Sequence, residues 1–168
     1  MFINSSLEPH TTPQDHKLWG EVTTLILQTS EHVQKLPKSH WPTLNCHSIC
    51  RALAICIPEV KVVDGLYLGL ECQRNGIPQQ VAVEIRNCSH SWLVTPDGAI
   101  IDPYPVGIII TNPILIGPKG PRTVFGHQLY FPDSEVTRRV MNPRIHRTSL
   151  IISGYMKASM KNEAVHQR

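Results

Sequence analysis

Residues 42–67, PTLNCHSICRALAICIPEVKVVDGLY, predict a short helix that leads directly into a strand, and this unit decides the fold class. The helix is expected over Cys46–Ile55, and Pro58 ends it because the residue before a proline disfavours helical geometry. One apolar stripe at helical spacing consists of Ile49, Leu53 and Cys56. Residues 60–70 are rich in β-branched and aromatic side chains, which is typical of a strand.

Another helix is expected before this unit, and several strands are expected after it. Thr12-Pro13-Gln14-Asp15 predicts a helix start, with Thr12 as the N-cap, and apolar spacing continues to about residue 36. Asn75-Gly76 indicates a hairpin turn. Further strands are expected at 80–86, 89–95, 98–102, 107–111 and 123–131. The predicted fold class is therefore α+β, with N-terminal helices packed on an antiparallel sheet.

The chain of 168 residues is long enough for one hydrophobic core, and we expect a single domain at 12–154. Segments 1–11 and 155–168 are expected to be flexible termini. A Pro/Gly-rich loop is expected at 112–122, and a short helix between about residues 133 and 141.

Residues 89–102, SHSWLVTPDGAIID, predict a hairpin whose register matters for function. Thr95-Pro96-Asp97-Gly98 suits a type I turn followed by a left-handed Gly98, which gives a three-residue loop. An odd-length loop places the even-numbered residues of both strands on one face. His90, Trp92 and Asp102 then share a face, whereas a two- or four-residue loop would separate the His from the Asp.

Cys46 is the candidate nucleophile, because a thiol in the first turn of a helix is biased toward the thiolate. Asn45 can cap this helix, and the Cys46 backbone N–H is the natural first donor of an oxyanion hole. The second donor stays open among His40, Trp41, Asn45 and His47. The alternative is that Cys46 is a small buried hydrophobic residue, a common environment for free cysteine.

His90 is the candidate general base and acid, and Asp102 is the candidate carboxylate that orients its ring. Trp41 and Trp92 are the candidate substrate-binding residues, although Trp92 can equally fill the core. Alternatively, His90 is a hydrogen-bonded core histidine, and Asp102 is an Asp that ends the strand before Pro103.

Metal binding is the rival chemistry. Possible zinc ligands are Cys46, His47, Cys50, Cys88 and His90. A structural zinc site usually shows paired Cys-x₂₋₄-Cys or His-x₃₋₅-His spacing, which this set lacks. We therefore expect no metal and no cofactor, read Cys50 as a core residue, and keep Cys88 as the second-choice nucleophile.

Charge is spread unevenly along the chain. Residues 138–168 contain seven Lys or Arg and one acidic residue, so this basic C-terminal tail is expected to be solvated or to contact an acidic partner. Nucleic acid is not expected as a partner, because the chain shows no basic stripe studded with aromatic residues. The sequence shows neither a signal peptide nor a membrane span, and five cysteines form no disulfide pattern. A cytoplasmic location is expected, with export by a signal-free route left open.

The order of Cys46, His90-Ser91-Trp92 and Asp102-Pro103 resembles the papain-like and transglutaminase-like superfamily, which includes NlpC-type cell-wall peptidases and arylamine acetyltransferases. The similarity covers residues 40–105. It implies a nucleophilic cysteine at the start of a helix packed on an antiparallel sheet, with His and Asp on neighbouring strands. It implies Cys46 as nucleophile, His90 as general base and acid, and Asp102 as the orienting carboxylate.

These features predict a cysteine-nucleophile enzyme that acts on an amide or isopeptide bond of a peptide or protein through an acyl-enzyme. Hydrolysis, deamidation and acyl transfer use the same residues, so the sequence leaves the choice among them open. The alternative is a non-catalytic or zinc-stabilised binding domain on the same scaffold.

Overall fold

The computed structural model describes residues 10–34, 36–67, 89–103, 113–118 and 130–166. Its helices are α1 (Pro13–Gln34), the 3₁₀ helix η2 (Lys38–Thr43), α2 (Cys46–Cys56), α5 (Ser134–Val140) and α6 (Pro143–His166). Its strands are β1 (Lys61–Tyr67), β2 (Ser89–Val94), β3 (Ile100–Asp102), β4 (Ile114–Ile116) and β5 (Tyr130–Pro132). They form one antiparallel five-stranded sheet in the order β4-β3-β2-β1-β5. The predicted α+β class is confirmed.

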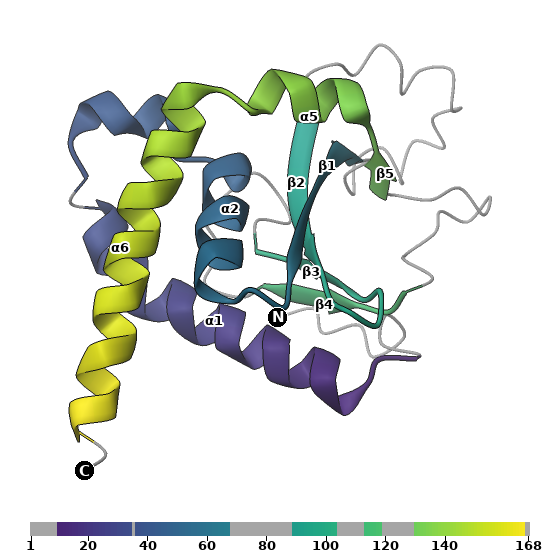
Figure 1. The fold of residues 1–168 in the computed structure, drawn as a ribbon, viewed down its shortest axis with the longest axis horizontal. Helices are drawn as coiled ribbons and strands as arrows, with labels where there is room; N and C mark the ends of the chain where they lie inside the picture. Colours follow the sequence, from purple (N-terminus) through teal and green to yellow (C-terminus); the bar gives the residue numbers. More distant parts are fainter. Residues whose placement is uncertain (1–9, 35, 68–88, 104–112, 119–129, 167–168) are drawn as a thin grey trace.

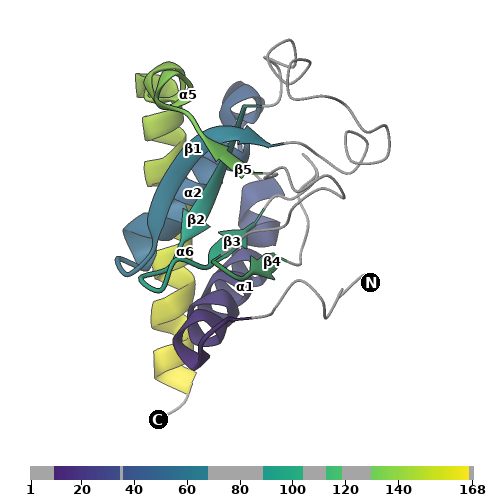
Figure 2. The same ribbon diagram turned by 90° about the vertical axis from the view of Figure 1, so that its right-hand side faces the viewer.

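Helix α2 lies between α6 and the strands β1 and β2, as Figure 1 shows. In the turned view of Figure 2, the strands lie in front of α6, which runs along the length of the molecule. The core forms where these layers meet, and its fully buried side chains include Leu18, Val22, Leu53, Leu93, Ile101 and Ile152. The packing fixes α2 against the sheet, so that the start of this helix meets the middle strands.

Helix α1 begins as the Thr12-Pro13-Gln14-Asp15 pattern predicts. The Thr12 N–H donates to Asp15 Oδ2 at 2.8 Å, and the Asp15 N–H donates to Thr12 Oγ1 at 3.1 Å. This reciprocal pair satisfies two N–H groups that the helix leaves unpaired. Asp15 also accepts the Thr95 hydroxyl at 2.5 Å, so the same carboxylate attaches α1 to the turn between β2 and β3.

That turn has the predicted geometry. Gly98 adopts the left-handed region at φ 86°, and its N–H donates to the Thr95 carbonyl at 3.0 Å. The Thr95 N–H donates to the Ala99 carbonyl at 2.9 Å and closes the three-residue loop. Leu93 pairs with Ile101, so the register continued by one residue places Trp92 opposite Asp102. The expected sharing of one face by the even-numbered residues is confirmed.

Helix α6 continues past Gly154 to His166, where no regular element was predicted, and the flexibility expected for 155–168 stays a prediction. Gly154 suggested an end, but a Cβ built there meets nothing within 4 Å, so this glycine is simply on the solvent side. A helical glycine costs only about 1 kcal/mol relative to alanine. Burial of Ile152 and Met156 on the opposite side outweighs that cost.

The loop predicted at 112–122 also needs correction, because Ile114–Ile116 form β4 beside β3. Asp133 caps α5 with its carboxylate on the Glu135 N–H at 2.8 Å, within the predicted 133–141 segment. The predictions for 1–9, 80–86 and 107–111, and most of 123–131, lie outside the described residues.

Six of the seven basic residues of the C-terminal region lie on α5 and α6, and Arg168 lies outside the described residues. The exposed ones are Arg138, Arg139, Arg144, Arg147, Lys157 and Lys161. Their contact with an acidic partner stays a prediction. Among the described helices, none combines the length and the hydropathy that a bilayer span requires.

Candidate active site

The N-terminus of α2 presents Cys46 as its first residue. Asn45 Oδ1 accepts the N–H groups of His47 and Ser48 at 3.1 and 3.2 Å, and the Asn45 N–H donates to Ser48 Oγ at 3.2 Å. The Ile49 N–H is bound to the Asn45 carbonyl at 3.1 Å. The Cys46 N–H therefore stands alone in this turn without a hydrogen-bond partner among the described residues. An N–H in this position favours negative charge on nearby atoms.

His90 and Asp102 meet across β2 and β3, as their shared face predicts. His90 Nε2 lies 2.8 Å from Asp102 Oδ2. Asp102 is fully buried, and the hydroxyl of Tyr130 on β5 donates to the same Oδ2 at 2.8 Å. Asp102 thus holds the imidazole at Nε2, which leaves Nδ1 as the ring nitrogen available to the sulfur.

Cys46 and His90 act on each other's ionisation, and His90 is bound to Asp102, so the three predicted residues form one row. Burial opposes ionisation of the Cys46 thiol, but the neighbouring His47 and His90 side chains lower its pKa from 9.0 to about 6. Burial likewise disfavours charge on His90, yet Asp102 and Cys46 raise its pKa from 6.5 to about 9. Between about pH 6 and 9 the pair is a thiolate and an imidazolium.

Aromatic rings surround the His90 imidazole. The Tyr67 ring lies 5.4 Å from it, and Trp92 contacts the Tyr130 ring edge-on at 5.1 Å. Trp92 keeps only 2% of its surface exposed, which favours the core interpretation of this residue over substrate contact. Trp41 lies in η2, and its side chain is outside the described part of the structure.

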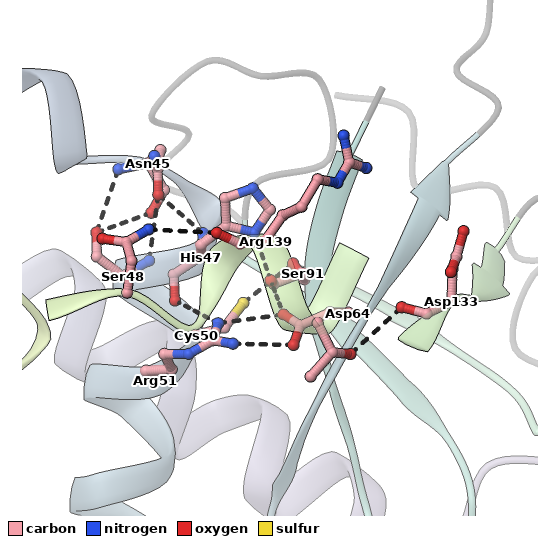
Figure 3. Close-up of polar contacts among 11 residues, drawn as sticks. Asn45, His47, Ser48, Cys50, Arg51, Asp64, Ser91, Asp133 and Arg139 are labelled. Carbon is pink, nitrogen blue, oxygen red and sulfur yellow. Dashed lines mark hydrogen bonds and ion pairs between the residues drawn. The ribbon is translucent and has the colours of Figure 1, made fainter. Parts of the chain in front are cut away.

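A second polar row runs from His47 through Ser91 and Asp64 to Arg51 (Figure 3). His47 Nδ1 lies 2.6 Å from the Ser91 hydroxyl, and that hydroxyl donates to Asp64 Oδ1 in a short hydrogen bond. Arg51 pairs with Asp64 through two hydrogen bonds of 3.1 and 2.8 Å. The row therefore joins α2 to β1 and β2 through buried charge-assisted bonds, which are the stronger kind.

The other described cysteines have packing roles. The Cys50 thiol is fully buried and donates to the Ser91 carbonyl at 3.1 Å, as the core interpretation predicted. Burial raises the Cys50 pKa well above its usual value, so this thiol stays protonated. Burial also raises the Cys56 pKa. Within the described ranges, no cluster of three or more possible metal ligands forms, and Cys88 lies outside these ranges.

Four residues of the site were not predicted: Arg51, Asp64, Ser91 and Tyr130. Two of them left a sequence signal, since Asp64 is an acidic residue in the middle of an otherwise largely apolar strand and Arg51 follows His47 by one helical turn. His47 was considered only as an oxyanion donor or a metal ligand. Its backbone N–H and its Nδ1 both have other partners in the fold.

Comparisons of the chain with models of known protein families, with curated proteins and with solved structures find no match. The chemistry of the site is therefore argued from its own geometry.

Proposed function

We propose that this protein is a cysteine-nucleophile enzyme that acts on an amide or isopeptide bond of a peptide or protein through an acyl-enzyme. The observation that carries the proposal is the row of Cys46, His90 and Asp102, with His90 Nε2 2.8 Å from a fully buried carboxylate. Nucleophile, proton carrier and orienting group are the three parts that thiol catalysis requires. The papain-like or transglutaminase-like core belongs to this proposal as well.

In the proposed reaction, the Cys46 thiolate attacks the carbonyl carbon, and the carbonyl π electrons move to the oxygen. The Cys46 N–H, unpaired among the described residues, is placed to donate to that oxyanion. Collapse of the intermediate breaks the C–N bond, and the His90 imidazolium gives its proton to the leaving nitrogen. A thioester on Cys46 and a neutral His90 remain.

The second half of the reaction depends on the acceptor. His90 removes a proton from water or from an amine, which attacks the thioester carbon, and the C–S bond then breaks to return the thiolate. Water gives hydrolysis or deamidation, and an amine gives acyl transfer. Cys46 and His90 expose 7% and 6% of their surfaces, so this chemistry takes place in a largely desolvated setting.

The test is whether an acyl group becomes attached to Cys46. Incubation with an aryl ester of a blocked amino acid should add one acyl group per chain by intact mass, and peptide mapping should locate it on Cys46. Cys46→Ser should remove the adduct, whereas Cys56→Ser, at a half-buried thiol with a raised pKa, should retain it. Chasing the adduct with buffer or with a primary amine separates hydrolysis from acyl transfer.

Iodoacetamide gives a second and independent test. An ordinary thiol, with a pKa of about 8.5, is almost fully protonated at pH 6. Cys46 should be alkylated preferentially there because its pKa is about 6. Slow, uniform labelling of all cysteines, together with no acyl adduct, would instead favour the non-catalytic binding domain.

A further inference from the structure

The second polar row has a defined direction of proton donation. Arg51 donates two hydrogen bonds to Asp64, so Asp64 is a carboxylate that can only accept. The Ser91 hydroxyl has one proton and donates it to Asp64. Ser91 Oγ must therefore accept from His47 Nδ1–H, across 2.6 Å. This assigns the ring proton of a neutral His47 to Nδ1 and leaves Nε2 as the nitrogen that can accept a proton.

The residues of this row are about as deeply buried as those of the first one. His47 and Asp64 expose 7% and 6% of their surfaces, and Ser91 is fully buried. An imidazole whose far nitrogen donates into an anionic chain is fixed in its tautomer and its orientation. Asp102 acts in this way on His90, and Asp64 acts in this way on His47 through the Ser91 hydroxyl.

Two imidazoles from two different elements, His47 on α2 and His90 on β2, lower the pKa of the Cys46 thiol. The other charged or titratable groups that act in this cluster are Cys50, Arg51, Asp64, Tyr67, Asp102 and Tyr130. Each carboxylate belongs to one row: Asp102 is bound to His90 and Tyr130, and Asp64 to Ser91 and Arg51. The two rows meet at the sulfur.

We propose that His47 is a second acid–base residue on the Cys46 sulfur, held for that task by Ser91, Asp64 and Arg51. In this step the S–H bond breaks, its proton passes to His47 Nε2, and the imidazolium keeps its Nδ1–H on Ser91. His47 thus maintains the thiolate while His90 carries protons to and from the leaving group and the acceptor. The inference rests on the proposed function for its catalytic meaning, but the protonation of the sulfur can be measured without turnover.

The experiment compares pH profiles of Cys46 alkylation by iodoacetamide in wild type, His47→Gln, His90→Asn and the double variant. The wild-type midpoint is expected near the Cys46 pKa of about 6. Each single variant should raise the midpoint by about 1 unit, a tenfold loss of thiolate on the acidic side. The double variant should reach or exceed the ordinary thiol value of about 8.5, because burial then acts on the Cys46 pKa without the two imidazoles. A His47→Gln midpoint equal to that of wild type would overturn the proposal.

Ser91→Ala provides a variant that keeps both imidazoles and cuts the link between His47 and Asp64. Its midpoint should also rise, by less than 1 unit, and this variant decides the question if His47→Gln does not fold. Ser149→Ala is the matched control, because this buried hydroxyl donates to the Ile145 carbonyl of its own helix. An unmoved Ser91→Ala midpoint, or an equal rise in Ser149→Ala, would count against the relay.

These outcomes are separable from the proposed function. Midpoints that move as expected without any acyl adduct on Cys46 would support the role of His47 and contradict the enzyme. An acyl adduct on Cys46 with unmoved midpoints would support the enzyme and overturn the role of His47.

Discussion

Gly65 lies in β1 against the backbone of β5, so replacing it with alanine gives a sharp test of the fold. A Cβ built at Gly65 lies 1.8 Å from the Phe131 carbonyl oxygen and 2.8 Å from Trp92 Cη2. The first contact is with backbone, which cannot rotate away as a side chain can. Gly65→Ala must therefore move β5 away from β1 and disturb three paired positions, Gly65–Pro132, Leu66–Phe131 and Tyr67–Tyr130.

The expected loss in free energy of unfolding is about 2–4 kcal/mol. Overpacking in a filled interior costs about 1–3 kcal/mol, and each backbone hydrogen bond lost between the strands adds about 1 kcal/mol. The displacement also reaches the site, because β5 carries Tyr130, whose hydroxyl binds Asp102 at 2.8 Å. Gly65→Ala should therefore slow acylation of Cys46 as well as destabilise the fold.

The assay is urea denaturation followed by circular dichroism, with Gly154→Ala as the matched control. A Cβ at Gly154, on the exposed side of α6, meets nothing within 4 Å. The same chemical change should therefore stabilise the protein there, by about 0.5–1 kcal/mol. The reasoning fails if Gly65→Ala unfolds within about 1 kcal/mol of wild type, or if both variants shift in the same direction.

Three further predictions concern the site. Tyr130→Phe removes one donor from the buried Asp102 carboxylate, so the free energy of unfolding measured by urea denaturation should fall by about 1.5–3 kcal/mol. The control Tyr155→Phe, at a half-buried ring, should lower the free energy of unfolding much less. Arg51→Gln leaves Asp64 without its cation and should cost about 3 kcal/mol by the same measurement; a cost below about 1 kcal/mol would contradict the buried ion pair. Acylation rate against pH should be bell-shaped, with limbs near 6 and 9 set by the coupled Cys46 and His90 pair, and a rate that still rises above pH 9 would contradict that assignment.

The sequence predicted best those features that depend on local chemistry. The Thr12 and Asn45 caps, the end of α2 and the left-handed Gly98 all follow from neighbouring residues, and the structure has each of them. The odd-length loop then determined the long-range contact, because strand register converts a local turn into a shared face. This is why the meeting of His90 with Asp102 could be predicted from sequence.

Features that depend on tertiary packing were not predictable in this way. Whether Gly154 ends α6 depends on what covers the opposite side of the helix, and that side packs against α1 and α2. The contact of Tyr130 with Asp102 requires β5 to pair with β1 rather than with its neighbours in sequence. The His47 row crosses three elements, so no local spacing indicates it.

The Cys46–His90 ion pair explains why the reactivity of the thiol, rather than the stability of the fold, should report on this site. The raised pKa of His90 adds stability that is fully present below pH 6.5 and is lost as pH rises through about 9. The lowered pKa of Cys46 adds stability that is present above pH 9.0 and is lost as pH falls through about 6. Between about 6.5 and 9 the folded pair holds one proton as an imidazolium, and the unfolded pair holds one as a thiol. The folded and unfolded states therefore hold the same number of protons, so the pair contributes almost no slope to a plot of the free energy of unfolding against pH. The sulfur, by contrast, is a thiolate in the folded state and a neutral thiol in the unfolded state, and alkylation detects this difference.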